Sequence, residues 1–462
     1  MKLDKNTILL LIILVVIIAF WVSHIKRPIP LDQGWAPPVR VTDSQNADVG
    51  GGDLYKWHDT LILLKDQYDR GAKSSTCSAM IRNHDSSNSW AQIPISDVPG
   101  DCAIYCPAFD EANNRIMFER GYIESNQLHM GAVFIHMTAN GRTQAEAERE
   151  WTRNQESLLG KTDHNVTLND PAILGLLGSK VKLSLKVNRD QPQLGKSLLT
   201  DSEVCIPYSL SAFTLSQPNT ISHGPYSSGI FYSTNLGKTW QMEKIAELDA
   251  AEPEMRRTKG YCYYFGMTRG GIWFSQKSAD GGSWSEPKFL TKTFASSRGG
   301  GAVAENDTVH FCWLDRRHEK WRLNIDRPYV GNYEVAYCQR KDSDSAWRKD
   351  IILSKGLLFS YSPSMSVEGD KIVVAWESGE SNKAWQSYDI CYATSKNGGK
   401  TWTRPLKVTD RAKDDTTSES PQVAVQNGVI HLFYTQGKRD RNSQVWNQGG
   451  WPVYYQQRPF PE

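Results

Sequence analysis

The chain has 462 residues and is nearly neutral, with 53 basic and 51 acidic side chains. This balance argues against a general nucleic-acid-binding protein, which needs a basic surface to neutralise phosphates, so we expect no nucleic-acid partner. The 16 Trp, 19 Tyr and 14 Phe exclude a disordered chain, which would lack the apolar side chains that offset chain entropy. The length allows two or three ordinary domains or one large repeat fold.

The N-terminus contains an unbroken apolar run from Ile8 to Val22. As a helix this run would reach roughly 25 Å, slightly less than a hydrocarbon core of about 30 Å. Lys2 and Lys5 precede it, as in an export signal, and no small-x-small cleavage site follows. We therefore predict a single-pass signal anchor with its linker over residues 1–30, contacting the membrane through residues 7–23. The rest of the chain would lie on the extracytoplasmic side; a cleaved signal and secretion are the alternative.

Eight cysteines in an exported chain suggest disulfides, but their surroundings point elsewhere. Five of them lie in apolar or aromatic runs and are predicted to be buried free thiols: Cys205, Cys262, Cys312, Cys338 and Cys391. Cys102 and Cys106 are the more plausible pair. No Cys/His cluster has metal-ligand spacing, and we expect neither a metal nor another cofactor.

A repeated frame, Ser-x-Asn-x-Gly-x-Thr-Trp, occupies residues 233–240 and 395–402, and residues 278–284 carry it one residue shorter. Residues 342–347 and 85–90 are eroded copies. Each copy follows a strand-like run. Asn, Asp and Gly tolerate positive φ and close tight turns, so the frame predicts a hairpin. The Trp that ends each copy is predicted to begin the closing strand and to pack between neighbouring units.

Four short strands for every 45 residues or so are typical of a propeller blade. We count seven units, starting near residues 53, 106, 203, 252, 299, 360 and 418. Residues 35–43 resemble the closing strand of a unit, and residues 418–457 lack one, so the two termini are predicted to share a blade. Residues 140–200 are predicted to be a small helical insertion, in which Thr143 begins a helix that Gly160 could end.

The repeated frame resembles the Asp box of the sialidase superfamily. This resemblance implies an all-β, sialidase-type propeller of six or seven four-stranded blades over residues 31–462, with the boxes on outer hairpins away from the central face. Family members include catalysts and non-catalytic receptors.

The resemblance also implies a set of site residues. Ser360 to Met365 is similar to the family's nucleophile segment, which gives Tyr361 as the nucleophile and Glu252 as its carboxylate partner, with Glu254 as a fallback. Asp69 or Asp66 would be the acid/base. Arginines of the family grip a substrate carboxylate. The matching candidates here are Arg269, Arg316, Arg317 and Arg322.

Three functions remain open from the sequence. The first is a membrane-anchored exo-glycosidase that hydrolyses terminal sugars of glycoconjugates, sialic acid among them. The second is a non-catalytic propeller that binds glycans or proteins at its central face, and the third is a glycosidase for another terminal sugar. The first-blade segment, residues 46–53, lacks the arginine that the family carries there. The partner in each enzyme reading is a glycan or glycoconjugate.

Overall fold

The computed structural model describes residues 29–41, 47–49, 54–57, 60–69, 74–82, 90–94, 102–110, 115–124, 127–136, 157–159, 193–200, 203–217, 220–235, 241–268, 271–291, 296–317, 333–355, 357, 359–379, 388–410, 416–437 and 452–461. Side chains are described for part of these ranges. The predicted anchor, residues 7–23, lies outside them. Every regular element in the described residues is a β-strand, and these residues contain no helix that could span a membrane. The all-β prediction is therefore confirmed for the part of the chain that the structure describes.

The described strands form seven antiparallel sheets. The first holds β2 (Ala47–Val49), β3 (Leu54–Trp57), β4 (Thr60–Asp69), β5 (Ser74–Arg82) and β6 (Trp90–Pro94); the second holds β7 (Cys102–Asp110), β8 (Arg115–Glu124), β9 (Gln127–His136) and β10 (Ser157–Leu159). The third holds β11 (Gln193–Leu194), β12 (Leu198–Leu199), β13 (Val204–Gln217), β14 (Thr220–Ser233) and β15 (Gln241–Ala246). The fourth holds β16 (Ala251–Arg257), β17 (Tyr261–Thr268), β18 (Gly271–Ser278) and β19 (Lys288–Phe289).

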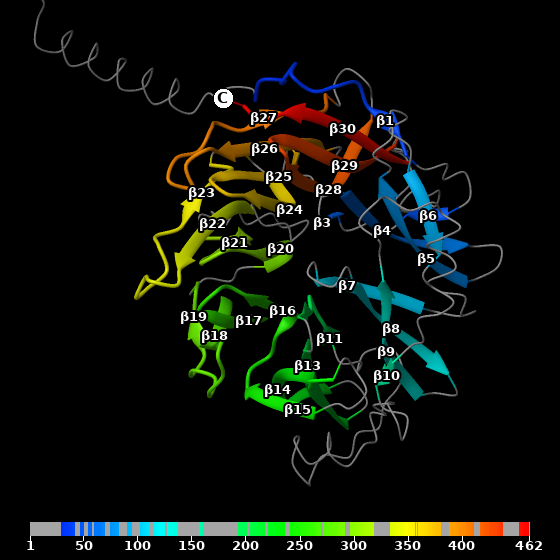
Figure 1. Ribbon diagram of the computed structural model, residues 1–462, viewed down its shortest axis with the longest axis vertical. Coiled ribbons are helices and arrows are strands. Elements are labelled where there is room, and N and C mark those ends of the chain that lie inside the picture. The colour runs from blue at the N-terminus through cyan, green and yellow to red at the C-terminus, as the bar shows by residue number, and fades with distance from the viewer. Residues whose placement is uncertain are drawn as a thin grey trace, which may run out of the picture.

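The remaining three sheets follow the same pattern. The fifth holds β20 (Ser296–Glu305), β21 (Thr308–Asp315), β22 (Glu334–Lys341) and β23 (Ile351–Ile352); the sixth holds β24 (Phe359–Glu368), β25 (Lys371–Gly379), β26 (Asp389–Ser395) and β27 (Leu406–Lys407). The seventh holds β28 (Thr417–Gln426), β29 (Val429–Gly437), β30 (Val453–Pro459) and β1 (Val39–Arg40). Figure 1 shows the sheets around a common axis, as in a β-propeller, with β3, β7, β11, β16, β20, β24 and β28 innermost.

Contacts between successive innermost strands close the ring. β16 contacts β20, β20 contacts β24, β24 contacts β28, and β28 contacts β3 of the first sheet. The seventh sheet joins the two ends of the described chain, because Val39 pairs with Tyr455 and Arg40 pairs with Tyr454. An N-terminal strand therefore covers the outer edge of a sheet that is otherwise built from the C-terminal segment.

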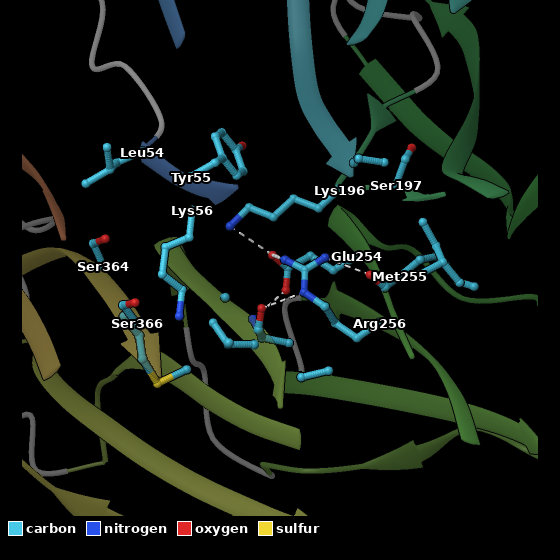
Figure 2. A pocket seen from close by; sticks show the side chains of 18 of the residues that line it. Leu54, Tyr55, Lys56, Lys196, Ser197, Glu254, Met255, Arg256, Ser364 and Ser366 are labelled. Carbon is cyan, nitrogen blue, oxygen red and sulfur yellow. Dashed lines mark hydrogen bonds and ion pairs between the residues drawn. The ribbon is translucent and has the colours of Figure 1, made fainter. Parts of the chain in front are cut away.

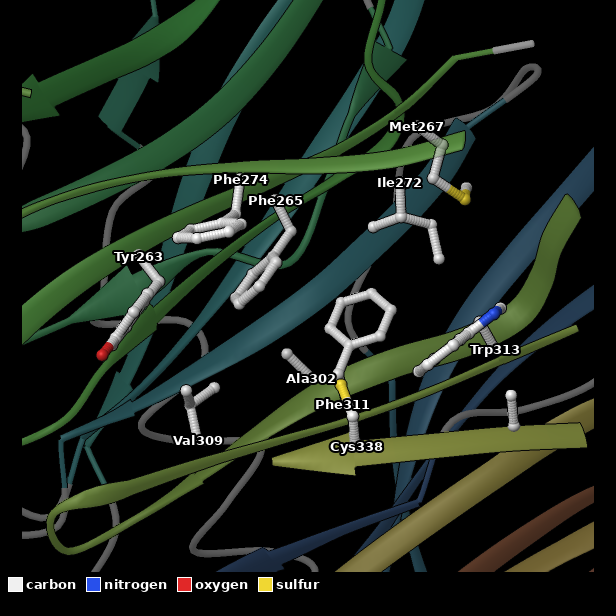
Figure 3. Packing of buried hydrophobic residues seen from close by; sticks show 11 residues of the cluster. Tyr263, Phe265, Met267, Ile272, Phe274, Ala302, Val309, Phe311, Trp313 and Cys338 are labelled. Atoms are coloured by element: carbon white, nitrogen blue, oxygen red, sulfur yellow. The ribbon is translucent and has the colours of Figure 1, made fainter. Parts of the chain in front are cut away.

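The core lies between the sheets. All eight residues of β21 are buried because its sheet is packed on both faces. Between the fourth and fifth sheets, Phe265, Phe311 and Trp313 belong to one apolar cluster (Figure 3). The Trp residues of the repeated frame join such clusters. Trp347 packs edge-on against Phe274 of the preceding sheet. Trp402 contacts Tyr337 in the same way.

The structure corrects three details of the prediction. Trp90 begins its closing strand β6 as predicted, whereas the closing strands β19 and β27 begin four residues after Trp284 and Trp402. Within the predicted helical insertion, Ser157–Leu159 is a strand, because it pairs with β9 and supplies the fourth strand of the second sheet. Gln193–Leu194 and Leu198–Leu199 are also strands, the innermost ones of the third sheet, rather than part of an insertion. The other residues of the insertion lie outside the described ranges.

The five cysteines predicted to be free are free, and all but the half-buried Cys205 are buried. The suggested Cys102–Cys106 pair is wrong. Both residues belong to the single strand β7. Four residues along an extended strand span about 13 Å, whereas a disulfide needs Cα atoms within about 7 Å of each other.

Candidate functional site

The residues predicted from the sequence fall at one end of the ring. The strands of each sheet are antiparallel, so the innermost strand begins at the end where the second strand finishes. Glu252 and Tyr361 lie near the starts of innermost strands β16 and β24. Asp69 is the last residue of second strand β4, and Arg316 directly follows second strand β21. We call this end the site face.

Two further candidates, Arg269 and Arg322, lie outside the described residues; in the sequence Arg269 follows Thr268, the last residue of β17. Asp66 and Asp69 are described only through the backbone of β4.

The repeated frames lie at the opposite end, where the third strand of a sheet turns toward the fourth. In the turn after β26, the Ser395 hydroxyl accepts hydrogen bonds from the backbone N–H groups of Asn397 and Gly399. In the turn after β14, the backbone N–H of Asn235 bonds the Ser233 hydroxyl in the same way. These side chains stabilise the hairpins and take no part in the site face.

A proline motif shapes the innermost strands near the site face. Glu252, Ser362 and Ser420 each have positive φ, at 50°, 46° and 54°, and each precedes a proline. The strand register shifts at each of these positions, for example between Tyr361 and Ser364, so each is a β-bulge. β7 shifts its register at Cys106-Pro107 as well. Sequence reasoning missed this x-Pro motif, although its recurrence at equivalent strand positions is visible in the sequence.

Tyr361 lies in an aromatic group at the site face. Its ring is 5.2 Å from the ring of Tyr333, 5.2 Å from Phe359 and 6.2 Å from Tyr388. The guanidinium of Arg316 lies over the Tyr333 ring, 5.2 Å from its centre. Three tyrosines and one arginine therefore come together from β24 and from the segments beside β21, β22 and β26.

The carboxylate that faces Tyr361 is Glu377. The two residues are direct partners across β24 and β25, so their side chains project from the same face of the sheet. Burial is the main cause that raises the pKa of the Tyr361 phenol; Tyr333, Tyr388 and Glu377 raise it further, while Arg316 opposes them. The phenol is therefore protonated at neutral pH, with a carboxylate and a guanidinium nearby.

Glu252 lies on the fourth sheet and Tyr361 on the sixth. Their expected partnership across the ring axis stays a prediction. Glu252 is exposed and lines the central cavity. Sequence reasoning missed Glu377 because its place opposite Tyr361 depends on which strands pair and in which register.

Arg316 and Arg317 have different surroundings. The Arg317 guanidinium is held by two carboxylates, with Nη2 2.5 Å from Asp315 and Nη1 2.5 Å from Asp350. Asp315 is fully buried and also accepts a hydrogen bond from the Trp313 indole. Burial alone would raise the pKa of Asp315, but its bonds to Arg317 and Trp313 lower it. Arg317 is thus a structural ion-pair residue, and Arg316 is the arginine that contacts the tyrosine group.

A cavity of about 720 Å³ lies on the ring axis, lined by residues of the innermost strands of all seven sheets. Figure 2 shows Lys56, Lys196, Glu254 and Arg256 around it, with Ser364 and Ser366 on the side of the sixth sheet. Its lining extends to Glu252 and Pro363 at the bulges, so it reaches the site face beside the Tyr361 segment.

Glu254, the fallback for Glu252, is an ion-pair centre within this cavity wall. Its Oε1 lies 3.0 Å from Lys196 Nζ and 3.2 Å from Arg256 Nη2, and its Oε2 accepts the Ala302 N–H at 2.6 Å. Burial favours a raised pKa for Glu254, but the two cations and the N–H outweigh it and lower the pKa. Glu254 is ionised and joins the third, fourth and fifth sheets.

Comparisons with known proteins agree with this architecture. No family model and no curated protein matches the sequence. Among solved structures, the polysaccharide lyase Uly1 superposes with a TM-score of 0.52 at 10% identity, over 93% of this chain and 100% of the lyase chain. An alpha-L-arabinofuranosidase from Fusarium graminearum has a TM-score of 0.45 at 11% identity, over 92% of this chain and 98% of that one.

A sialidase from Trypanosoma rangeli has a TM-score of 0.43 at 10% identity, and the match covers 91% of this chain and 60% of the sialidase chain. At such identities a similarity concerns the fold alone. The superposition with the lyase supports the same ring of sheets along nearly the whole chain.

Proposed function

We propose that this chain is a glycan-acting propeller of seven blades whose site face removes terminal sugars from glycoconjugates as an exo-glycosidase. The observation that carries the proposal is the position of Tyr361 at the site face, opposite Glu377 and close to Arg316, two residues before Pro363 of the cavity lining. The solved structures with a similar fold are named as a polysaccharide lyase and an arabinofuranosidase, and both names refer to carbohydrate substrates. This supports a carbohydrate as the general class of substrate here.

The roles follow from the chemistry of the groups. Because its pKa is raised, the Tyr361 phenol is nucleophilic only if a base takes its proton as the oxygen bonds to the anomeric carbon. Glu377 is the carboxylate opposite it and would take that proton. A guanidinium fork matches a carboxylate, so Arg316, with Arg269 as a second candidate, would bind an acidic terminal sugar such as sialic acid. Asp69 would protonate the leaving oxygen.

The same proposal includes the place of the protein. Residues 7–23 would anchor the chain in a membrane, with the ring on the extracytoplasmic side. The uniform apolarity of Ile8 to Val22 supports this, as do the lysines that precede the run and the lack of a small-x-small cleavage site after it.

The test is a set of turnover assays on the full chain in detergent. Fluorogenic sialosides and arabinofuranosides report glycoside hydrolysis, and absorbance of the unsaturated product reports lyase activity on acidic polysaccharides. Tyr361→Phe and Glu377→Gln should each lower kcat by about a thousandfold or more on the accepted substrate. Tyr333→Phe is the matched control, because it removes a hydroxyl from the same aromatic group and leaves Tyr361 intact. Full activity of Tyr361→Phe would overturn the assignment.

A non-catalytic glycan-binding propeller is the second candidate. Two observations favour it. The guanidinium of Arg317 is already paired with Asp315 and Asp350, and residues 46–53 contain no arginine. On this reading no substrate is turned over, and the full chain binds acidic glycans on an array. Arg316→Ala should then abolish binding, while Tyr361→Phe should leave it within about twofold.

A further inference from the structure

The segment that follows the proposed anchor is fixed on the outer edge of the sixth sheet. Leu31 pairs in parallel with Lys407 of β27. The Lys407 backbone N–H donates to the Pro30 carbonyl at 2.9 Å, and the Asp32 N–H donates to the Lys407 carbonyl at 2.9 Å. Asp32 also bonds the Tyr392 hydroxyl and the Arg458 guanidinium. The structure therefore determines where the preceding chain reaches the ring.

Ile29, the first described residue, lies at this outer edge. It packs against the apolar cluster that contains Leu353 and Trp376. Because the pairing of Leu31 with Lys407 is parallel, Ile29 is level with Pro405, next to Arg404. β23 and β27 are the outermost strands of the fifth and sixth sheets in Figure 1. Ile29, at the start of the described chain, thus lies on the rim of the ring at these two sheets.

The exposed charged side chains of this part of the rim are mostly basic. Of the described residues between 341 and 410, seven exposed side chains are cationic and one, Asp370, is anionic. The cations are Lys341, Arg348, Lys349, Lys355, Lys396, Lys400 and Arg404. Nearby carboxylates are engaged: Asp344 pairs with Arg348, and Asp350 pairs with Arg317. We call these seven residues the basic rim.

The cations share one region of the ring. Lys341 is the last residue of β22, Arg348 and Lys349 lie between β22 and β23, and Lys355 follows β23. The other three lie between β26 and β27, around the hairpin that carries the repeated frame. Within residues 203–291 the balance is reversed, because the described exposed charges there are five carboxylates and two lysines. They are Glu203, Glu247, Glu252, Asp280, Glu286, Lys259 and Lys288.

We propose that the basic rim docks on an anionic membrane surface, with acidic lipid headgroups as its ligands. The proposal rests on the anchor of the proposed function. Six residues, 23–28, separate the apolar run from Ile29, and fully extended they span at most about 20 Å. Lys26 and Arg27 add two cations within this link. An anchored chain therefore holds the basic rim near the headgroups, where each Lys or Arg gains attraction to acidic lipid.

Docking at the rim fixes the orientation of the ring. The fourth sheet is next to the fifth round the ring, so the exposed carboxylates of the third and fourth sheets limit how far the docked surface extends along the rim. The ring axis then lies along the membrane, and the site face opens sideways. In this orientation the site meets glycans carried by neighbouring molecules of the same membrane.

The test is amine acetylation of the full chain in nanodiscs, read by mass spectrometry. Nanodiscs of phosphatidylcholine alone are compared with nanodiscs that also contain phosphatidylserine. Lys349, Lys355 and Lys400 should be acetylated at least fivefold more slowly with phosphatidylserine, and high salt should reverse this protection. Lys259 and Lys288 on the acidic side serve as internal controls and should react equally in both.

Two charge-reversed variants sharpen the test. Lys355→Glu with Lys400→Glu and Arg404→Glu should lose the lipid-dependent protection of Lys349. The matched control, Lys259→Glu with Lys288→Glu and Arg40→Glu, changes the net charge equally and should keep it. Equal protection of the rim in neutral and acidic nanodiscs would overturn the proposal.

Failure of the anchor is a separate result. A chain that does not insert into nanodiscs contradicts the anchor, and the rim is then tested by flotation with phosphatidylserine vesicles. Salt-sensitive flotation that only the rim variant loses supports the rim. No flotation overturns it, and rim protection by a soluble acidic polysaccharide without vesicles would assign the rim to glycans instead.

Discussion

The Glu254 carboxylate accepts a hydrogen bond from the backbone N–H of Ala302, in the next sheet round the ring, at 2.6 Å. Ser364 accepts the Val423 N–H at 3.1 Å, and Ser366 accepts the Val425 N–H at 3.0 Å, from the sixth sheet to the seventh. In the described part of each sheet, the innermost strand pairs with strands of its own sheet on one side only, so N–H groups on its other side need acceptors from elsewhere. Side chains of the preceding sheet supply them.

Replacing Glu254 by Gln should destabilise the ring. The amide can still accept one hydrogen bond, but Lys196 and Arg256 lose the charge that holds them. Breaking a buried ion pair costs about 3 kcal/mol or more, and urea unfolding measures it. Ser366→Ala is the control, because it removes a hydrogen bond without a charge and should cost about 1 kcal/mol. Equal stability of Glu254→Gln and the unaltered chain would contradict this role.

The sequence predicts the ring more fully than it predicts the site. Self-similarity exposes the fold because turns such as Ser395 to Trp402 need the same residue types in every sheet. The repeat units predicted to start near residues 252, 299, 360 and 418 begin close to the innermost strands β16, β20, β24 and β28. The helix from Thr143 to Gly160 is wrong at Ser157–Leu159, where the open edge of β9 outweighs the local helix signals.

The site depends on information that local patterns lack. Tyr361 is identifiable from its segment, whereas Glu377 follows only from strand pairing. Ser364 pairs with Ala375, and the bulge at Ser362 then adds one residue to β24 before Tyr361. A residue count that ignores the bulge would therefore not pair Tyr361 with Glu377. Tyr333 and Tyr388 also pack against Tyr361, but the segments that carry them show no sequence repeat that would predict this.

Two buried histidines should make stability fall as the pH is lowered. The Nδ1 of His310 lies 2.7 Å from the Tyr337 hydroxyl, and that of His431 lies 2.8 Å from the Tyr455 hydroxyl. Burial lowers the pKa of His310 to about 4. Burial, with Arg82 nearby, lowers the pKa of His431 to about 3. Both rings therefore stay neutral in the folded chain while the unfolded chain takes up protons below pH 6.5.

The stability that these histidines give is complete above about pH 6.5 and is lost as the pH falls toward their folded-state pKa values. For His310 alone the loss amounts to roughly 3 kcal/mol. Urea unfolding between pH 7 and pH 5 measures the slope, above the range where Glu254 takes up protons. His310→Gln should flatten the slope, and an unchanged slope in that variant would exclude His310 as its source.

Glycine at the bulges should be tolerated or favourable. Ser362 and Ser420 have φ of 46° and 54°, which costs a residue with a Cβ about 1 kcal/mol. Ser362→Gly removes this cost and should leave the melting temperature equal or slightly higher, although glycine also gains entropy in the unfolded chain. Ser362→Val is the comparison, because a β-branched residue fits this backbone poorly and should lower the melting temperature by several degrees. A lower melting temperature for glycine than for valine would contradict the strain.

The neighbours Arg316 and Arg317 should separate binding from stability. Arg317→Ala leaves the buried Asp315 without its guanidinium and should cost about 3 kcal/mol in urea unfolding. Arg316→Ala removes a cation from the Tyr333 ring, where the contact contributes about 1 kcal/mol or less. On the proposed function, Arg316→Ala should raise KM for an acidic substrate about tenfold or more, while Arg317→Lys, which keeps a charge near Asp315, should preserve KM. If Arg316→Ala costs more stability than Arg317→Ala and leaves KM unchanged, Arg316 is structural and the substrate carboxylate binds elsewhere on the site face.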